Sequence, residues 1–342
     1  MRRKTPSGFY FVLFIAAIAF VYSAGLTRSP VPLTDLAAQH VRSGEGRIGV
    51  YLTAYATTNA SIMDEVYAAR AAGQIDTVVV NVKNMHGEVT YDSQVSLARE
   101  IGATTDTLDL PALLQNLHER GFYVIARQVV FYDPILAAHL ARDDAWVPCD
   151  SPVVREYNLD IASEVASLGF DEIQFDYVRY PDGGDLETVY EDRYEAIASF
   201  LADATSRLGG RYPVSADVFG RVMWPWNTKR IDPIGQSLED MAPYLSYISP
   251  MLYPSHYVEQ AYKDDPYRTV HDALTSGHER VQANFRPFLQ AFDLALPSGM
   301  SLQTYIKEQI RAARDNGADG YLFWNPECRY GPLFDVLDPS LN

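Results

Sequence analysis

The chain has 342 residues, enough for one large domain or two ordinary ones. Hydrophobic residues make up 47% and charged residues 21%, a globular composition that argues against intrinsic disorder over most of the chain. The net charge is −16 and no block of Lys and Arg offsets it, so nucleic acid is not an expected partner.

The N-terminus predicts export. Three basic residues at 2–4 precede an apolar run over 9–21, and small residues follow, which is the layout of a secretory signal. The alternative is an uncleaved anchor attached to the membrane through residues 9–26, which are just long enough to cross it. Either interpretation predicts an extracytoplasmic protein. The chain is divided accordingly into a signal peptide or membrane anchor (1–26), a linker (27–46) and a folded domain (47–336).

A helix–glycine–strand unit recurs along the folded domain. An amphipathic stretch ends in Gly73, Gly121, Gly169 or Gly317, where a helix needs a left-handed residue before the chain turns into a strand. The predicted helices lie at 61–72, 110–120, 152–168 (with Ser151 as cap) and 301–316. The predicted strands lie near 48–53, 77–83, 122–128, 172–177, 213–217, 245–252, 281–286 and 320–324.

Eight strands alternating with helices predict an α/β protein with a (β/α)8 TIM barrel, whose usual size is about 250 residues. The structural alternative is a doubly wound open sheet. That fold often carries a Gly-rich phosphate loop after the first strand, and "GVYLTAYATTNA" is not such a loop. The barrel is therefore favoured, with its site at the carboxyl ends of the strands.

Two of these strand ends carry a carboxylate on the face that should point toward the barrel axis. In the fourth strand Gln174 and Asp176 alternate with apolar residues, and in the fifth Asp217 does the same. Neighbouring strands lie about 4.8 Å apart. The two carboxylates could therefore approach the separation of about 5–5.5 Å found in retaining glycosidases. Close carboxylates also have their pKa values pushed apart, which yields one anion and one acid.

A purely structural role remains open for each carboxylate. Asp176 could form an ion pair with Arg127 or Arg179 that closes the barrel top, and Asp217 could cap the following loop. Arg127 is expected to orient a carboxylate rather than to react.

Aromatic residues after the strands suit a carbohydrate, because sugar rings have apolar faces and polar rims. Tyr253 and Trp324 are candidate sugar contacts, together with His86, although His86 also suits an ordinary loop. No His spacing supports a metal site, and we expect no cofactor. Cys149 and Cys328 are the only cysteines. Export would permit a disulfide between them, and a pair of free thiols is the alternative.

The motif "GFDEIQFDYVRYP", with "GVYLTAY", "VVVNVKNMHGEV", "SPMLYPSHY" and "GYLFWNP", resembles a bacterial glycoside hydrolase family with a TIM-barrel domain that is distantly similar to the α-amylase superfamily. The resemblance runs from about Arg47 to Phe334. It implies a nucleophile at the end of the fourth strand, here Asp176. Amylase-like families usually place a Glu acid on the fifth strand, where this chain has Asp217.

These observations lead to one hypothesis and one alternative. The hypothesis is an extracytoplasmic retaining glycosidase acting on polysaccharide or cell-envelope glycan, with Asp176 as nucleophile and Asp217 as acid and base. Gln174, Arg127 and Arg179 would position Asp176. The alternative is a non-catalytic carbohydrate-binding barrel. The sequence does not fix the sugar, the linkage or the oligomeric state.

Overall fold

The computed structural model describes residues 46–337, which form one compact unit of helices and strands. The predicted signal peptide or anchor and all of the linker except Gly46 lie outside the described residues. Between residues 46 and 337, no helix combines the length and the apolar character needed to cross a bilayer.

The centre of the fold is a closed barrel of parallel strands. Sheet neighbours follow chain order, and β1 pairs with both β2 and β10, which closes the cylinder. An open doubly wound sheet is therefore excluded. The barrel strands are β1 (Arg47–Leu52), β2 (Thr77–Lys83), β5 (Tyr123–Val129), β6 (Glu172–Asp176), β7 (Val214–Phe219), β8 (Tyr247–Leu252), β9 (Phe288–Gln290) and β10 (Gly320–Trp324).

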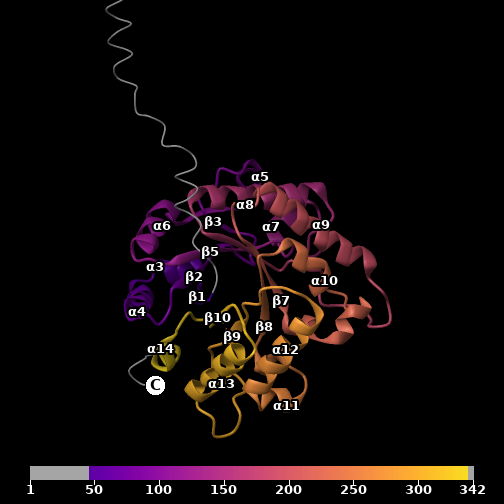
Figure 1. Ribbon diagram of the computed structural model, residues 1–342. Coiled ribbons are helices and arrows are strands. Elements are labelled where there is room, and N and C mark those ends of the chain that lie inside the picture. The colour runs from indigo at the N-terminus through magenta and orange to yellow at the C-terminus, as the bar shows by residue number, and fades with distance from the viewer. Residues whose placement is uncertain (1–45, 338–342) are drawn as a thin grey trace, which may run out of the picture. The chain divides into compact units, whose positions relative to one another are not determined.

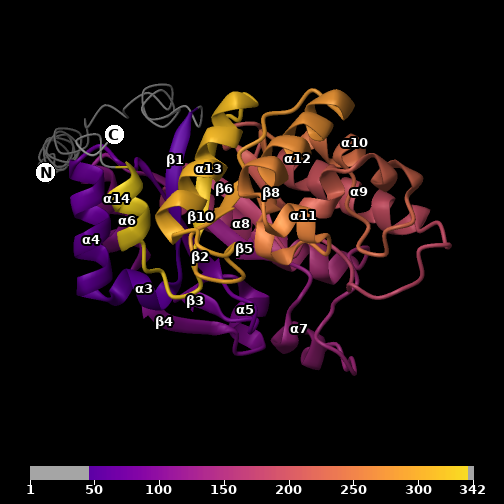
Figure 2. The same cartoon turned by 90° about the horizontal axis from the view of Figure 1, so that it is seen from below.

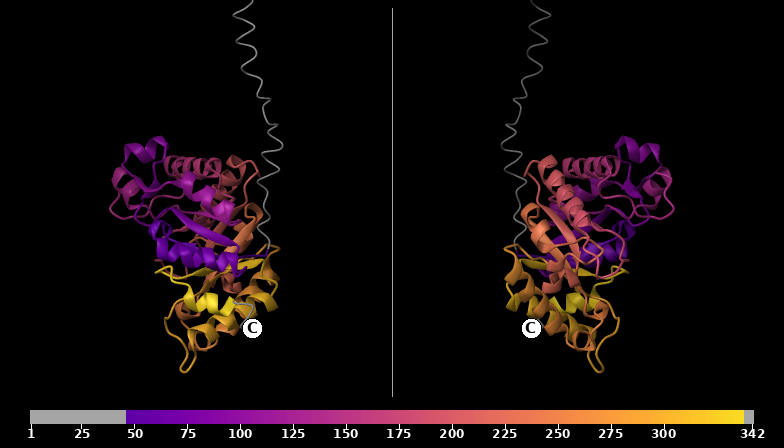
Figure 3. Two further views of the ribbon diagram at one scale, coloured as in Figure 1. Left: turned by 90° about the vertical axis from the view of Figure 1, so that its left-hand side faces the viewer. Right: turned by 90° about the vertical axis from the view of Figure 1, so that its right-hand side faces the viewer.

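Helices form the outer layer around these strands (Figures 1 and 3). The α-helices are α3 (Ala54–Thr58), α4 (Ala60–Ala71), α5 (Ser96–Glu100), α6 (Leu110–Glu119), α7 (Pro134–His139), α8 (Pro152–Leu168), α9 (Glu191–Arg207), α10 (Leu238–Met241), α11 (Gln260–Lys263), α12 (Pro266–Arg280), α13 (Leu302–Asp315) and α14 (Gly331–Leu337). Short 3₁₀ turns are η1 (Gly220–Met223), η2 (Pro225–Lys229), η3 (Ala242–Tyr244) and η4 (Pro254–His256).

The predicted left-handed glycines are confirmed. Gly73, Gly121, Gly169 and Gly317 have φ angles of +73°, +81°, +115° and +64°, a region that residues with a Cβ rarely adopt. Ser151 lies at the N-cap of α8, but its side chain makes no capping hydrogen bond there. The four predicted helices are present within about one residue of their expected limits as α4, α6, α8 and α13.

The predicted seventh strand at 281–286 is wrong in position. The chain joins the sheet only at Phe285, through a single bridge to Ile248, and the strand proper is β9. The physical reason is Pro287, which has no N–H to donate to a ladder, so regular pairing starts after it.

Extra elements gather at one end of the barrel. After β2 the chain forms β3 (Val89–Tyr91), antiparallel to β2, and then β4 (Thr104–Leu108), parallel to β3. In Figure 2 these two strands lie with α5 and α7 at the end of the barrel where β2 and β5 finish. This end is the carboxyl mouth.

The lower interior of the barrel is filled by a buried ion pair. Glu172 of β6 pairs with Arg286, and both side chains have no solvent exposure. Glu172 also accepts hydrogen bonds from the hydroxyls of Tyr123, at 3.0 Å, and Ser215. Because each charge has a partner, the barrel tolerates them in its interior.

We predict that Glu172→Gln lowers the free energy of unfolding by about 3–5 kcal/mol, because it leaves the Arg286 charge buried and unpaired. Urea denaturation measures this loss. The double variant Glu172→Gln with Arg286→Met removes both charges and should recover most of it. A cost below about 1 kcal/mol for the single variant would contradict this account of the interior.

Candidate active site

Asp176 and Asp217 lie on adjacent strands at the carboxyl mouth. The β6–β7 register pairs Phe175 with Ala216, so the next residue of each strand is one of the two aspartates. Both are buried, with 7% of Asp176 and 3% of Asp217 exposed. Phe175, of opposite parity, packs against Phe200 of the helix layer. The alternation along the strand therefore separates a helix-facing surface from the surface that carries the carboxylates.

The carboxylate of Asp176 is held at both oxygens. Arg127 of β5 directs Nε to Oδ2 at 2.9 Å, and its Nη2 reaches the same oxygen. The backbone N–H of Tyr177 donates to Oδ1 at 2.6 Å. Arg127 is itself oriented, because its Nη1 donates to Oδ1 of Asn81 at 2.9 Å and its guanidinium lies 5.2 Å from the centre of the Tyr51 ring. Asp176 is thus a fixed and charge-compensated group.

Asp217 has a different environment. Its Oδ1 is sealed from solvent and has no hydrogen-bond partner among residues 46–337. Burial raises its pKa well above the usual value, and the negative charge of Asp176 raises the pKa further, although Arg127 and Arg286 oppose the change. Asp217 therefore keeps its proton to higher pH than an ordinary Asp. The pair can supply one anion and one proton donor, which is the combination needed for acid–base chemistry.

An aromatic pair lies beside the two carboxylates. Tyr253 and Trp324 stack with ring centres 5.4 Å apart and planes 26° apart. The pKa of the buried Tyr253 is raised, first by burial and then by the charges of Asp217 and Asp176, so its hydroxyl stays protonated. Trp324, at the end of β10, is partly exposed at the mouth. Tyr253 therefore lies close to both carboxylates, and Trp324 packs on its ring.

The other predicted site residues do not contact Asp176 directly. Gln174 is fully buried one layer deeper, where its Nε2 donates to Oγ of Ser249 at 3.3 Å. Arg179 donates to the carbonyl oxygen of Tyr180 at 3.0 Å instead of to a carboxylate. His86 is exposed in the turn between β2 and β3. Gln174 and Arg179 thus make no hydrogen bond to Asp176, whereas the charge of Asp176 does act on Arg179: burial lowers the pKa of Arg179, and Asp176 opposes that change. The position of these two residues relative to Asp176, and a sugar contact at His86, stay predictions.

Sequence reasoning missed two positioning residues. Asn81 is the polar residue in "VVVNVK", and a lone amide in an apolar strand was a usable signal. Gln236, in the connection between β7 and β8, has no such local signal. Its side chain accepts from the backbone N–H of Phe219 at 3.0 Å and donates to the carbonyl oxygen of Asp217 at 3.0 Å. Gln236 therefore fixes the backbone that presents Asp217.

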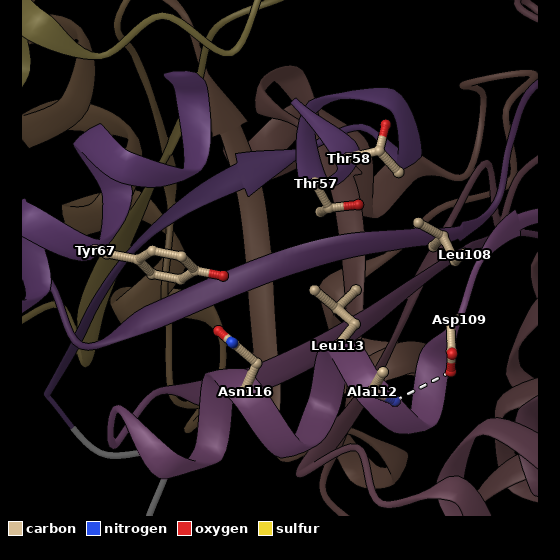
Figure 4. A pocket seen from close by; sticks show the side chains of 8 residues that line it. All are labelled: Thr57, Thr58, Tyr67, Leu108, Asp109, Ala112, Leu113 and Asn116. Carbon is tan, nitrogen blue, oxygen red and sulfur yellow. Dashed lines mark hydrogen bonds between the residues drawn. The ribbon is translucent and has the colours of Figure 1, made fainter. Parts of the chain in front are cut away.

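The cysteines and other potential ligands lie outside this arrangement. Cys149 and Cys328 are buried free thiols. Over residues 46–337, no three His, Cys, Asp or Glu side chains form a group suited to a metal ion. The hollow of ≈ 260 Å³ in Figure 4 is in the outer layer and not at the paired carboxylates. It is lined by Thr57, Thr58, Tyr67, Leu108, Asp109, Ala112, Leu113 and Asn116.

The chain is similar to glycoside hydrolases in its sequence family and in its fold. A family model described as "Putative glycosyl hydrolase domain" matches residues 49–330. No curated protein sequence matches the chain. The glycoside hydrolase domain of PgaB (BpsB) from Bordetella bronchiseptica is similar in structure, with a TM-score of 0.64 and 13% identity, over 86% of this chain and 99% of that one.

Two further solved structures share the fold. The spore cortex-lytic enzyme SleL from Bacillus cereus has a TM-score of 0.55 and 11% identity, over 90% of this chain and 81% of that one. A chitinase from Rhizomucor miehei has a TM-score of 0.55 and 13% identity, over 86% of this chain and 100% of that one. At these identities the likeness shows the barrel fold alone. It does not test the expected distant similarity to the α-amylase superfamily.

We predict that Asp217→Asn stabilises the protein at neutral pH. The folded pKa of Asp217 is raised above the unfolded value of about 3.9, so wild type loses stability as pH rises and the unfolded chain ionises first. The Asn side chain stays neutral and avoids that loss. The gain should be near zero at about pH 4 and grow toward pH 8, as measured by urea denaturation across this range.

Asp176→Asn provides the matched comparison. It leaves the buried guanidinium of Arg127 without its counter-charge and should destabilise the protein at neutral pH. If Asp217→Asn proved no more stable than wild type at pH 8, burial of Asp217 would not be costly and its raised pKa would be refuted.

Proposed function

The chain belongs to this glycosyl hydrolase family, and on that premise we propose that it hydrolyses O-glycosidic bonds with retention of anomeric configuration, using Asp176 and Asp217. The observation that carries the proposal is the juxtaposition of an ion-paired Asp176 with a buried Asp217 of raised pKa. Adjacent strands lie about 4.8 Å apart, close to the carboxylate separation of about 5–5.5 Å that double displacement requires.

In the first step an oxygen of the Asp176 carboxylate attacks the anomeric carbon. The bond between that carbon and the glycosidic oxygen breaks, and the leaving oxygen takes the proton of Asp217. The product is a glycosyl ester on Asp176 and an ionised Asp217. Arg127 remains beside Asp176 and stabilises its negative charge, which is lost when the ester forms and returns when the ester breaks.

In the second step a water molecule takes the place of the departed sugar. Asp217, now a carboxylate, accepts a proton from the water as its oxygen attacks the anomeric carbon. The ester bond breaks, Asp176 regains its negative charge, and Asp217 is again protonated. Two inversions give net retention.

We further propose that the substrate is a polysaccharide or cell-envelope glycan and that the enzyme acts outside the cytoplasm. The basic and apolar leader supports export. The stacked rings of Tyr253 and Trp324 support binding of a sugar ring, whose apolar face packs on aromatic carbon. A chitinase and a spore cortex-lytic enzyme share the barrel fold, which is compatible with a polymeric substrate.

We predict that both Asp176→Asn and Asp217→Asn abolish most hydrolysis on a panel of bacterial exopolysaccharides and cell-wall glycans, measured as new reducing ends. Loss of the general acid should cost about 10²–10⁴ in kcat. On an aryl glycoside of the sugar that the panel identifies, the leaving group needs no proton. Asp217→Asn should then keep much of its glycosylation rate, while Asp176→Asn should not.

Asp160→Asn is the matched control, since Asp160 lies on α8 in the helix layer and pairs with Arg207 at 3.1 Å. It should retain near wild-type rates. Proton NMR of the first-formed product should show the anomer of the substrate. Full activity in either catalytic variant, or an inverted product, would refute the corresponding assignment. Glycan binding without any hydrolysis by wild type would favour the carbohydrate-binding barrel instead.

A further inference from the structure

A second cationic group lies at the mouth, next to the paired aspartates. Arg179 follows β6 by three residues and is half-buried. Its guanidinium carbon lies over three aromatic rings, 4.5 Å from the centre of Phe219, 4.7 Å from Trp146 and 5.1 Å from Tyr177. These rings hold the guanidinium in place through its faces, and none of the three side chains accepts a hydrogen bond from its N–H groups.

Most of the donors of Arg179 are unused. Nη1 donates to the carbonyl oxygen of Tyr180, and Nε and Nη2 have no acceptor within residues 46–337. Neither nitrogen is among the side-chain atoms sealed from solvent without a partner, so both reach solvent. An arginine has five N–H donors in a rigid planar fork. The N–H edge of the Arg179 guanidinium is therefore held at a fixed position with most of its donors free.

The neighbouring carboxylates are already engaged. Asp176 is paired with Arg127, and Asp182 receives both terminal nitrogens of Arg221 at 3.0 and 2.6 Å. No carboxylate of the described chain lies within ion-pairing distance of Arg179. The charges of Asp176 and Asp182 act on Arg179 from a longer distance, but neither carboxylate bonds to its N–H groups. The unused N–H edge is therefore available to an anionic group from outside the protein.

We propose that Arg179, with the rings of Trp146, Tyr177 and Phe219, forms a subsite for a sugar carboxylate, and that the substrate is an acidic glycan containing uronic acid. The planar carboxylate matches the free edge of the guanidinium in a two-point hydrogen bond. The three aromatic rings hold the guanidinium in position for that bond. This inference rests on the proposed function for the identity of the mouth as a glycan site.

The acidic surface is compatible with a charged substrate of this kind. At physiological salt, charges further than about 8 Å away are largely screened, so the overall charge weakens long-range attraction without deciding contacts inside the mouth. Recognition then depends on the local cation. A neutral substrate would leave the free N–H edge of Arg179 without an anionic acceptor in the complex.

Binding of uronate oligosaccharides tests the proposal independently of catalysis. Hexasaccharides of polygalacturonate, alginate and hyaluronan are compared by calorimetry with the same oligosaccharides after reduction of each carboxyl to a primary alcohol. At least one native oligosaccharide should bind wild type about 10- to 100-fold more tightly than its reduced form, the range expected for a hydrogen bond to a charged group. Arg179→Gln should abolish this preference, and Arg179→Lys should keep only part of it.

Arg120→Gln is the matched control. Arg120 also lies over an aromatic ring, 4.3 Å from the centre of Tyr67, and donates to a backbone carbonyl, but it ends α6 on the outer layer. It should leave the preference for carboxylated oligosaccharides unchanged. A purely structural role for Arg179 would lower thermal stability in Arg179→Gln without changing the ratio of the two affinities.

The outcomes separate this inference from the proposed hydrolysis. If no native oligosaccharide is preferred over its reduced form, or if the preference survives in Arg179→Gln, the carboxylate subsite is refuted even where neutral glycans are hydrolysed. If the preference depends on Arg179 but no oligosaccharide is cleaved, the subsite stands and the proposed hydrolysis fails.

Discussion

The ion pair between Arg127 and Asp176 is the interaction on which the candidate site depends. Two carboxylates on adjacent strands repel each other, and burial makes the repulsion stronger. Arg127 compensates one of them, so Asp176 can be an anion inside the barrel. Desolvation by burial and the remaining repulsion from Asp176 then act on Asp217 and raise its pKa. One guanidinium thus gives two identical side chains different electrostatic surroundings.

The positions of these groups depend on polar contacts that reach beyond the aspartates. Asn81 turns Arg127 toward Asp176, and Gln236 ties the backbone of β7 to the loop that follows it. Arg286 and Glu172 lie below and also influence the pKa of Asp217, in opposite directions. The barrel interior is therefore a connected set of polar side chains supported by an apolar shell of strands and helices. Such a set fixes side-chain directions more tightly than apolar packing alone.

Local patterns in the sequence were sufficient for the barrel and for the two carboxylates. Alternation of polar and apolar residues along "EIQFD" and "VSADV" follows from the pleat of a strand, so Asp176 and Asp217 were predictable as neighbours. Glycines after helices marked the starts of strands for the same local reason. The seventh strand was predicted too early in the chain, because strand propensity takes no account of the N–H group that Pro287 lacks.

Long-range contacts were not predictable in the same way. Gln174 has the parity of Asp176, yet it bonds to Ser249 of β8, because barrel curvature brings alternate strands together across the axis. Arg179 follows the strand closely in sequence, but it packs on Trp146 and Phe219, which come from other segments, and forms no ion pair with Asp176. Gln236 comes from an irregular connection whose path no periodicity describes. These placements depend on how the barrel closes, and the residue pattern of a single strand carries no information about that.

The buried pair of Glu172 and Arg286 has a consequence for how a polymer is handled. The pair fills the axis below the carboxylates, so the barrel is a cup with one opening and not a tube. A polysaccharide of the kind proposed would have to lie across the rim, since it could not thread through. Both fragments of a cleaved chain would then leave by the opening through which the polymer arrived. They would leave past the segments after β5, β6 and β7, which meet at the rim where Arg179 packs on Trp146, Tyr177 and Phe219.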